Sequence, residues 1–187
     1  MSDPLSDVFE MVGVESSVYF QKDFLGPWCM DVSNTGFAQF HILVRGSAVV
    51  TYAGKTSFVR AGDIVFFPRG ASHLIGDATD SKPMSGFAVI EAMNEGREPF
   101  TEGVRATRMI CGHFEYDFGY SHPILEELPE MVLIRADELP TTDHLFSLVK
   151  IIIIESANAA PGSDVITRRL SDAVSYTHLT LPTILRV

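Results

Sequence analysis

Residues 61–73 read AGDIVFFPRGASH, and this stretch decides how the rest of the chain is interpreted. The pair Gly62-Asp63 marks a turn, and four apolar residues follow it before a second turn begins at Pro68. Such a continuous apolar run is typical of a strand buried on both faces or in a barrel wall. Proline ends the run because it cannot donate to a sheet ladder. The pattern predicts a strand, a turn, and a second strand that begins at His73.

Short β-type segments separated by turn signals surround this stretch on both sides. In chain order they cover residues 16–20, 28–32, 37–44, 47–53, 56–59, 63–68, 73–76, 85–90, 105–114 and 131–134. A charged loop is expected at residues 93–104. Many short strands at such spacing are typical of a sandwich or barrel. We therefore predict a mainly β fold, a single barrel over about residues 16–134.

Helical patterns appear near the two ends of the chain and in a short segment, residues 124–128, that Pro123 opens. Residues 3–12 have apolar side chains at helix spacing, and so do residues 143–157 and the segment that begins at Asp164. Four consecutive isoleucines at 151–154 would also suit a strand, but a capping Thr142 or Asp143 favours a helix. The expectation is a short amino-terminal helix and a carboxy-terminal helical hairpin flanking the barrel.

The spacing of Gly62, Pro68, Gly70 and His73 resembles the second motif of the cupins, which are double-stranded β-helix barrels. Read with FHILVRG at 40–46, CGHFEYD at 111–117 and HPILEELP at 122–129, it resembles the amino-terminal cupin domain of AraC-type transcriptional regulators over about residues 3–174. The resemblance implies a barrel that binds a small-molecule effector or metal and pairs as a homodimer. It also implies a carboxy-terminal pair of helix-turn-helix units that binds DNA, and this sequence shows no such part.

Composition and charge are consistent with a reduced, cytoplasmic domain. The 187 residues include 14 Lys plus Arg against 24 Asp plus Glu, a formal charge of −10 that would repel nucleic acid from the surface as a whole. Two cysteines are too few for a disulfide framework. The first residues show no signal-peptide pattern, and the longest apolar run, residues 148–154, is too short to span a membrane.

The last residues have a different character from the rest. VSYTHLTLPT at 174–183 resembles the translation of a sequencing-library adapter. We therefore expect residues 1–174 to form the cupin sensing and dimerisation domain, cut inside a helix, and residues 175–187 to be a non-native tail that adds nothing to the fold. The alternative is a genuine β tail.

Four side chains are candidate metal ligands inside the barrel: His41, His73, Cys111 and His113. Imidazole nitrogens and thiolates are ligands of zinc and similar divalent transition metals, and Cys111 and His113 share a strand face because they lie two residues apart. The first cupin motif is incomplete, however, because Gln39 stands where a ligand is expected from the resemblance. The alternative is that the histidines are hydrogen-bonded core residues and that Cys111 is a small buried hydrophobe.

Three functions are compatible with these features. The favoured one is a non-enzymatic regulatory domain that senses a small effector. The competing ones are a stand-alone metal-dependent cupin enzyme, such as a dioxygenase or isomerase, and a purely structural dimerisation barrel. No phosphate-binding loop, GxSxG elbow or HExxH motif occurs in the sequence. Several aromatic residues are expected to be barrel core rather than a ligand cage, namely Phe37, Phe40, Phe66, Phe67 and Phe87.

Overall fold

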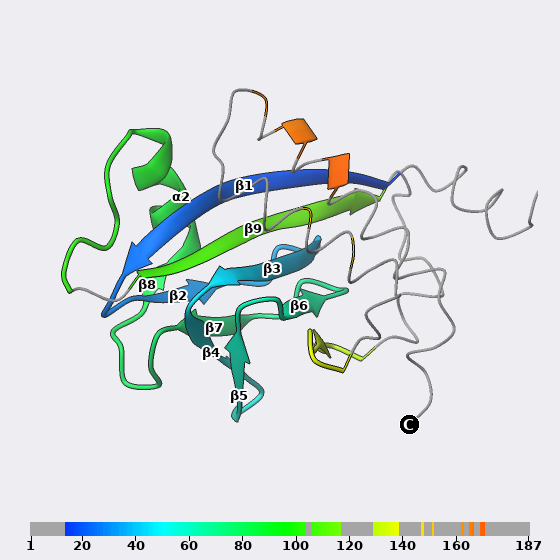
Figure 1. Cartoon of the computed structure of the whole chain (residues 1–187), viewed down its shortest axis with the longest axis horizontal. Coiled ribbons are helices and arrows are strands. Elements are labelled where there is room, and N and C mark those ends of the chain that lie inside the picture. The colour runs from blue at the N-terminus through cyan, green and yellow to red at the C-terminus, as the bar shows by residue number, and fades with distance from the viewer. Residues whose placement is uncertain are drawn as a thin grey trace, which may run out of the picture.

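The computed structural model describes residues 14–103, 106–116 and 129–138, and the single positions 147, 151, 162, 165–166 and 169–170. Within them the chain is mainly β, as predicted (Figure 1). The strands are β1 (Val14–Leu25), β2 (Cys29–Val32), β3 (Ala38–Arg45), β4 (Ser47–Tyr52), β5 (Lys55–Arg60), β6 (Ile64–Phe67), β7 (His73–Gly76), β8 (Met84–Ser85), β9 (Ala106–Tyr116) and β10 (Val132–Ile134). The described helix is α2 (Gly86–Asn94).

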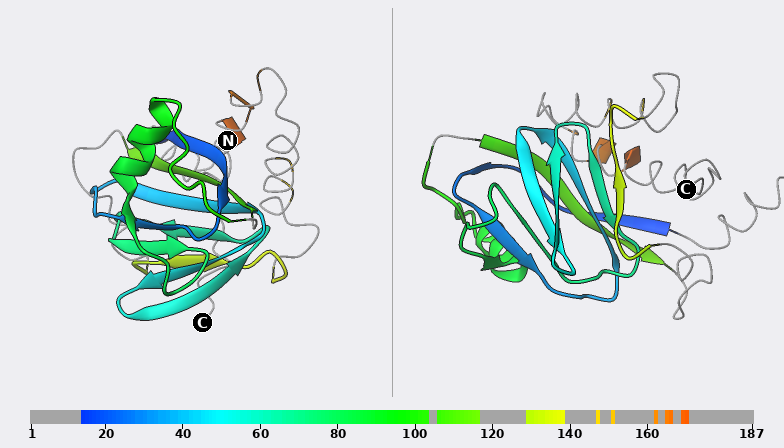
Figure 2. Two further views of the ribbon diagram at one scale, coloured as in Figure 1. Left: turned by 90° about the vertical axis from the view of Figure 1, so that its left-hand side faces the viewer. Right: turned by 90° about the horizontal axis from the view of Figure 1, so that it is seen from below.

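The strands form two five-stranded sheets that face each other (Figure 2). The first sheet has the order β1-β9-β3-β6-β10, and the second has the order β5-β4-β7-β2-β8. Neighbours pair antiparallel, except that β8 runs parallel to β2. The predicted turns at Gly46, Gly54 and Gly62 separate consecutive strands, and these glycines adopt positive φ.

The stretch at 61–73 folds as its sequence predicts. All four residues of β6 are buried, and the strand pairs with β3 on one side and with β10 on the other. The turn that follows is closed by Gly70, whose N–H donates to the carbonyl of Phe67 at 3.0 Å. Gly70 has φ +65° and lies against the backbone of Phe37, so a Cβ at this position would collide with it. His73 then begins β7.

Asp63 ties this stretch to the last described strand. Its fully buried carboxylate accepts hydrogen bonds from the Arg60 N–H at 3.1 Å, from the Ala136 N–H at 3.0 Å and from Arg135 Nη1 at 3.0 Å. One side chain therefore accepts hydrogen bonds from both the turn before β6 and the segment after β10. A buried carboxylate held by several donors is stable only while those donors remain in place.

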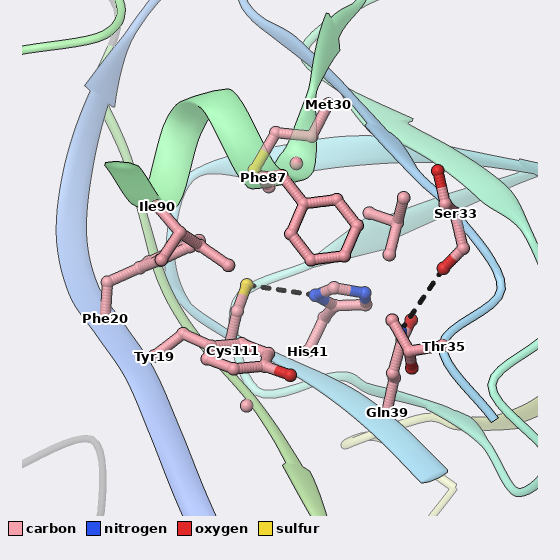
Figure 3. A pocket seen from close by; sticks show the side chains of 13 residues that line it. Tyr19, Phe20, Met30, Ser33, Thr35, Gln39, His41, Phe87, Ile90 and Cys111 are labelled. Atoms are coloured by element: carbon pink, nitrogen blue, oxygen red, sulfur yellow. Dashed lines mark hydrogen bonds between the residues drawn. The ribbon is translucent and has the colours of Figure 1, made fainter. Parts of the chain in front are cut away.

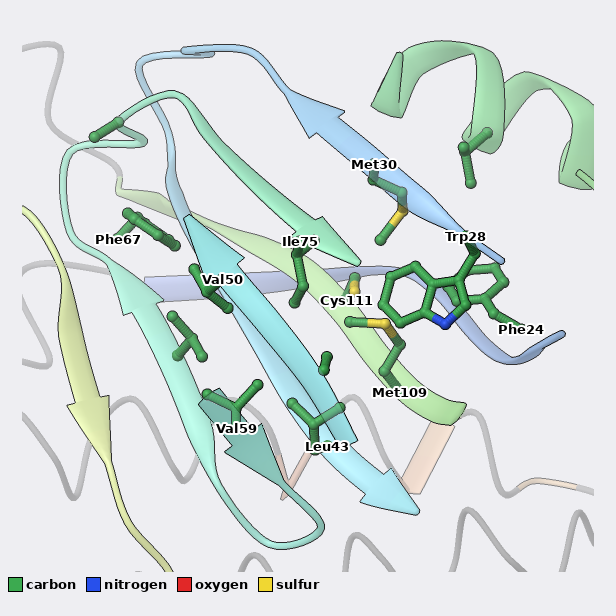
Figure 4. Packing of buried hydrophobic residues seen from close by; sticks show 14 residues of the cluster. Phe24, Trp28, Met30, Leu43, Val50, Val59, Phe67, Ile75, Met109 and Cys111 are labelled. Atoms are coloured by element: carbon green, nitrogen blue, oxygen red, sulfur yellow. The ribbon is translucent and has the colours of Figure 1, made fainter. Parts of the chain in front are cut away.

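The alternation of β6 divides the apolar residues into two clusters. Val65 and Phe67 belong to the larger cluster, which fills the space between the two sheets (Figure 4). Its largest fully buried members include Trp28, Phe24 and Met30. Ile64 and Phe66 point to the opposite face of the first sheet and belong to the second cluster, against which Leu170 packs. The strand is therefore buried on both faces, as its continuous apolar sequence indicates.

The segment at 85–90 was predicted to be a strand, and this prediction is wrong. Only Met84 and Ser85 pair with β2, and the chain then turns into α2. The helix buries Val89 and Ala92, which are three residues apart and therefore share a helical face. It lies across one end of the two sheets, where it closes the space between them (Figure 2).

The helices predicted at the chain ends lie mostly outside the described residues. Residues 3–12 and 124–128 lie outside the described residues, and so do residues 175–187, which form the predicted tail. The predicted carboxy-terminal hairpin is represented only by isolated positions and is not supported by them, so it stays a prediction. Among the described residues, no helix is long and apolar enough to cross a membrane.

Candidate functional site: a cavity beneath helix α2

A cavity lies between the two sheets, beneath α2 (Figure 3). Residues from five parts of the chain line it: Tyr19 and Phe20 of β1, Met30 and Val32 of β2 with Ser33 and Thr35 after it, Gln39 and His41 of β3, Gly86, Phe87 and Ile90 of α2, and Cys111 and Gly112 of β9. The space within its wall is about 490 Å³, part of it open to solvent. The centres of water-sized molecules can occupy ≈ 50 Å³ of it, several times the roughly 10–15 Å³ that one water needs.

The wall of this cavity is apolar and carries no formal charge. None of its lining residues is Asp, Glu, Lys or Arg, and its walls are built mainly from aromatic, aliphatic and Met side chains. Concave, mostly apolar sites with a few polar groups are the usual form of small-molecule pockets. The cavity is therefore a candidate ligand site.

His41, His73 and Cys111 form one buried chain of hydrogen bonds beside the cavity. His73 Nδ1 lies 2.8 Å from the carbonyl oxygen of Ala71, which can only accept, so Nδ1 carries the proton. In a neutral ring His73 Nε2 is then an acceptor, and His41 Nε2 donates to it at 2.7 Å. His41 Nδ1 in turn accepts from the Cys111 thiol, with its Sγ at 2.9 Å. Each tautomer thus follows from one backbone carbonyl.

Burial keeps all three groups neutral. It lowers the pKa of His41 well below its ordinary value, and the neighbouring His73 lowers it further. Burial also lowers the pKa of His73 to about 4, although the hydrogen bond to Ala71 acts in the opposite direction. The pKa of the Cys111 thiol is raised well above its ordinary value by burial. Desolvation disfavours the charged form in each case.

This neutral chain predicts a loss of stability in mild acid. The unfolded chain takes up a proton on His73 near pH 6.5, whereas the folded protein resists until about pH 4. The contribution of His73 is therefore complete above pH 6.5 and is lost as the pH falls from 6.5 to about 4. Between pH 7 and pH 4, the free energy of unfolding of the wild type, measured in urea, should fall by about 3 kcal/mol more than that of a His73→Gln variant. Equal losses in the two proteins would contradict the conclusion that His73 is neutral in the folded protein.

The three donors do not surround a common point. Cys111 Sγ and His73 Nε2 contact opposite nitrogens of the His41 ring, so one ion could not be bound by all three at the roughly 2.0–2.3 Å that zinc requires. The strands that carry His41 and His73, β3 and β7, belong to different sheets. Among the described residues, no group of three or more His, Cys, Asp or Glu is placed to hold a metal. A divalent ion does not fit this arrangement, and metal binding stays a prediction.

His113 lies apart from this chain of hydrogen bonds. It is on the same strand as Cys111 and pairs in register with Gln39, two cross-strand pairs away from the pair of His41 and Cys111. Its ring stacks on Tyr19, with centroids 4.7 Å apart, and is 5.3 Å from the ring of Phe37. The structure thus brings together three of the four predicted ligands and places the fourth among aromatic rings.

Two aromatic residues expected in the core are exposed instead. Phe37 is 48% exposed and Phe87 is 64% exposed, and Phe87 borders the cavity from α2. By contrast Phe40, Phe66 and Phe67 are buried as expected. The contribution of Ser33, Thr35 and α2 to the cavity could not be predicted, because a polar turn and a segment with strand propensity carry no ligand motif.

The fold and the cavity together define a small β-barrel with an apolar cavity. The chain matches the cupin family over residues 3–179 and belongs to it. It is also similar to the HTH-type transcriptional regulator AlkR of Acinetobacter baylyi, with 25% identity over 176 residues. That match covers 87% of this chain and 55% of AlkR, so the chain spans about half the length of that relative.

Solved structures of similar fold were found at lower identity. ToxT from Vibrio cholerae with an unsaturated fatty acid bound has 8% identity and a TM-score of 0.40, covering 88% of this chain and 53% of ToxT. YhaK from Escherichia coli has 10% identity and a TM-score of 0.39, covering 72% of this chain and 46% of YhaK. A cupin protein from Bacteroides fragilis has 14% identity and a TM-score of 0.35, covering 69% of this chain and 93% of that protein.

Proposed function

We propose that this chain is the effector-sensing and dimerisation domain of an AraC-type transcriptional regulator. The cavity beneath α2 binds a small-molecule effector, and two copies of the chain associate through carboxy-terminal helices. DNA is contacted only by a separate helix-turn-helix part, and the protein acts in the cytoplasm without catalysing a reaction. The observation that carries the proposal is a preformed, uncharged cavity in a cupin chain that is similar to an HTH-type regulator.

The competing hypothesis, a metal-dependent cupin enzyme, has less support from the site. Such an enzyme needs several ligands that face one ion and an acid or base beside it. Here both ring nitrogens of His41 are engaged, one by Cys111 and the other by His73. The lining residues also include no carboxylate that could serve as an acid or base.

Ligand-dependent stabilisation tests the proposal. A panel of small uncharged organic molecules should include compounds that raise the melting temperature of the wild type. At ten times the Kd, mass action adds about 1.4 kcal/mol, which is roughly 3–6 °C for a chain of this size. The matched variant is Ile90→Trp, which fills the cavity from α2 and should abolish the shift. Chemical turnover of a stabilising compound would contradict the proposal.

Association is expected to depend on the segment 143–157. Its apolar residues Leu148 and Ile152 are four positions apart in the sequence, as neighbours on one helical face would be. Replacing both with Glu should convert a dimer into a monomer in sedimentation equilibrium, because buried carboxylates without partners oppose association. The control is Phe58→Glu on the edge strand β5, where Phe58 is 58% exposed. Loss of the dimer in the control alone would move the interface to that edge.

A further inference from the structure

The cavity has no means of neutralising a charged ligand. The thirteen residues that line it include no charged side chain. His41, its one imidazole, is neutral and uses both ring nitrogens within the chain to Cys111 and His73. A carboxylate or ammonium group moved from water into such a wall would lose its hydration without gaining a partner, which is costly.

Gln39, which lines the cavity, has one polar side-chain atom without a hydrogen-bond partner. Gln39 is 2% exposed, and its Nε2 donates to Thr35 Oγ1 at 2.8 Å and to the carbonyl of Ser33 at 3.5 Å (Figure 3). Because the Ser33 carbonyl can only accept, the amide nitrogen occupies that side and Oε1 occupies the other. Oε1 is buried and has no hydrogen-bond partner. A buried acceptor without a donor is a costly arrangement that a suitable ligand group would relieve.

We propose that the cavity selects an uncharged, mainly apolar molecule with a single hydrogen-bond donor. This donor forms a hydrogen bond to Gln39 Oε1. A medium-length aliphatic alcohol has this chemistry, whereas the carboxylate of similar length does not. The proposal rests on the proposed function of the cavity as the effector site and narrows the class of effector. It makes Gln39 the residue that discriminates between ligands of equal size.

Methyl NMR of the full chain tests the proposal with three probes matched in size. They are 1-hexanol, its isomer 1-methoxypentane, which has no donor, and the anion pentanoate. The Met30 methyl resonance reports occupancy because Met30 lines the cavity, and Met109, which is buried elsewhere in the core, is the reference. In the wild type 1-hexanol should bind about tenfold more tightly than 1-methoxypentane, and pentanoate should bind more weakly than both.

A Gln39→Met variant keeps the length of the side chain and removes its acceptor. It should bind the alcohol and the ether with Kd values equal within about twofold. Three results would overturn the proposal: an ether that binds wild type as tightly as the alcohol, a preference for alcohol that survives in Gln39→Met, or tightest binding by pentanoate. The wild-type ranking decides even if the variant does not fold. If no probe shifts the Met30 resonance, the cavity is not a ligand site and the proposed function fails as well.

Discussion

Replacing Phe67 with alanine should lower the free energy of unfolding by about 3–5 kcal/mol, the usual cost of removing a buried aromatic side chain. Phe67 is fully buried at the end of β6, and its ring stacks on His73 with centroids 3.7 Å apart and an interplanar angle of 7°. It also packs edge-on against Tyr52. The truncation would leave a cavity between the sheets and remove the support for the His73 ring. Urea unfolding at pH 7 measures the loss.

The matched control is Phe58→Ala on β5. Phe58 is 58% exposed, so its truncation should change the unfolding free energy by no more than about 0.5 kcal/mol. A loss below about 1 kcal/mol for Phe67→Ala, or equal losses for the two variants, would show that β6 is not at the centre of the core.

The second large effect is expected at Asp63. An Asp63→Ala variant removes the shared acceptor of the Arg60 and Ala136 N–H groups. It also removes the carboxylate partner of the Arg135 guanidinium, which is 28% exposed and keeps its hydrogen bond to the Phe58 carbonyl. Removing one partner of a buried ion pair typically costs about 3 kcal/mol or more, which corresponds to a fall of roughly 6–12 °C in melting temperature. Differential scanning calorimetry measures it.

The control for Asp63 is Asp137→Ala, which removes an exposed ion pair with Arg60. Solvent screens such surface pairs, so the melting temperature of this variant should stay within error of the wild type. If Asp63→Ala also melts within error of the wild type, the buried carboxylate does not hold β10 against the β5–β6 turn.

The barrel could be predicted largely because its strands have local signals. The run at 64–67 has no polar residue, and Pro68 and Gly70 fix where it ends, so β6 and the start of β7 follow from a few residues. Helix α2 lacks such a signal, because Phe87, Val89 and Ile90 favour a strand while the neighbouring Glu91, Ala92 and Met93 favour a helix. Packing of Val89 and Ala92 against the sheets decides the outcome.

The candidate site could be predicted only in part. His41, His73 and Cys111 were singled out by residue type, and the structure does bring them together. Their roles depend on facts that the sequence does not contain: the register that sets His41 opposite Cys111, the position of β7 across the barrel, and the carbonyl of Ala71 that fixes the tautomers. In the sequence, Gln39 was notable only because it stands where the resemblance leads one to expect a metal ligand. That it lines the cavity follows from the structure.

The most direct test of the sensing role joins this chain to a DNA-binding domain that represses its operator only as a dimer. Repression of a reporter is then measured with and without 1-hexanol, in the wild type and in Ile90→Trp. Repression should change with the ligand in the wild type and should be insensitive to the ligand in Ile90→Trp. A fusion that fails to repress, or one whose repression responds equally to the ligand in both proteins, would contradict the sensing role.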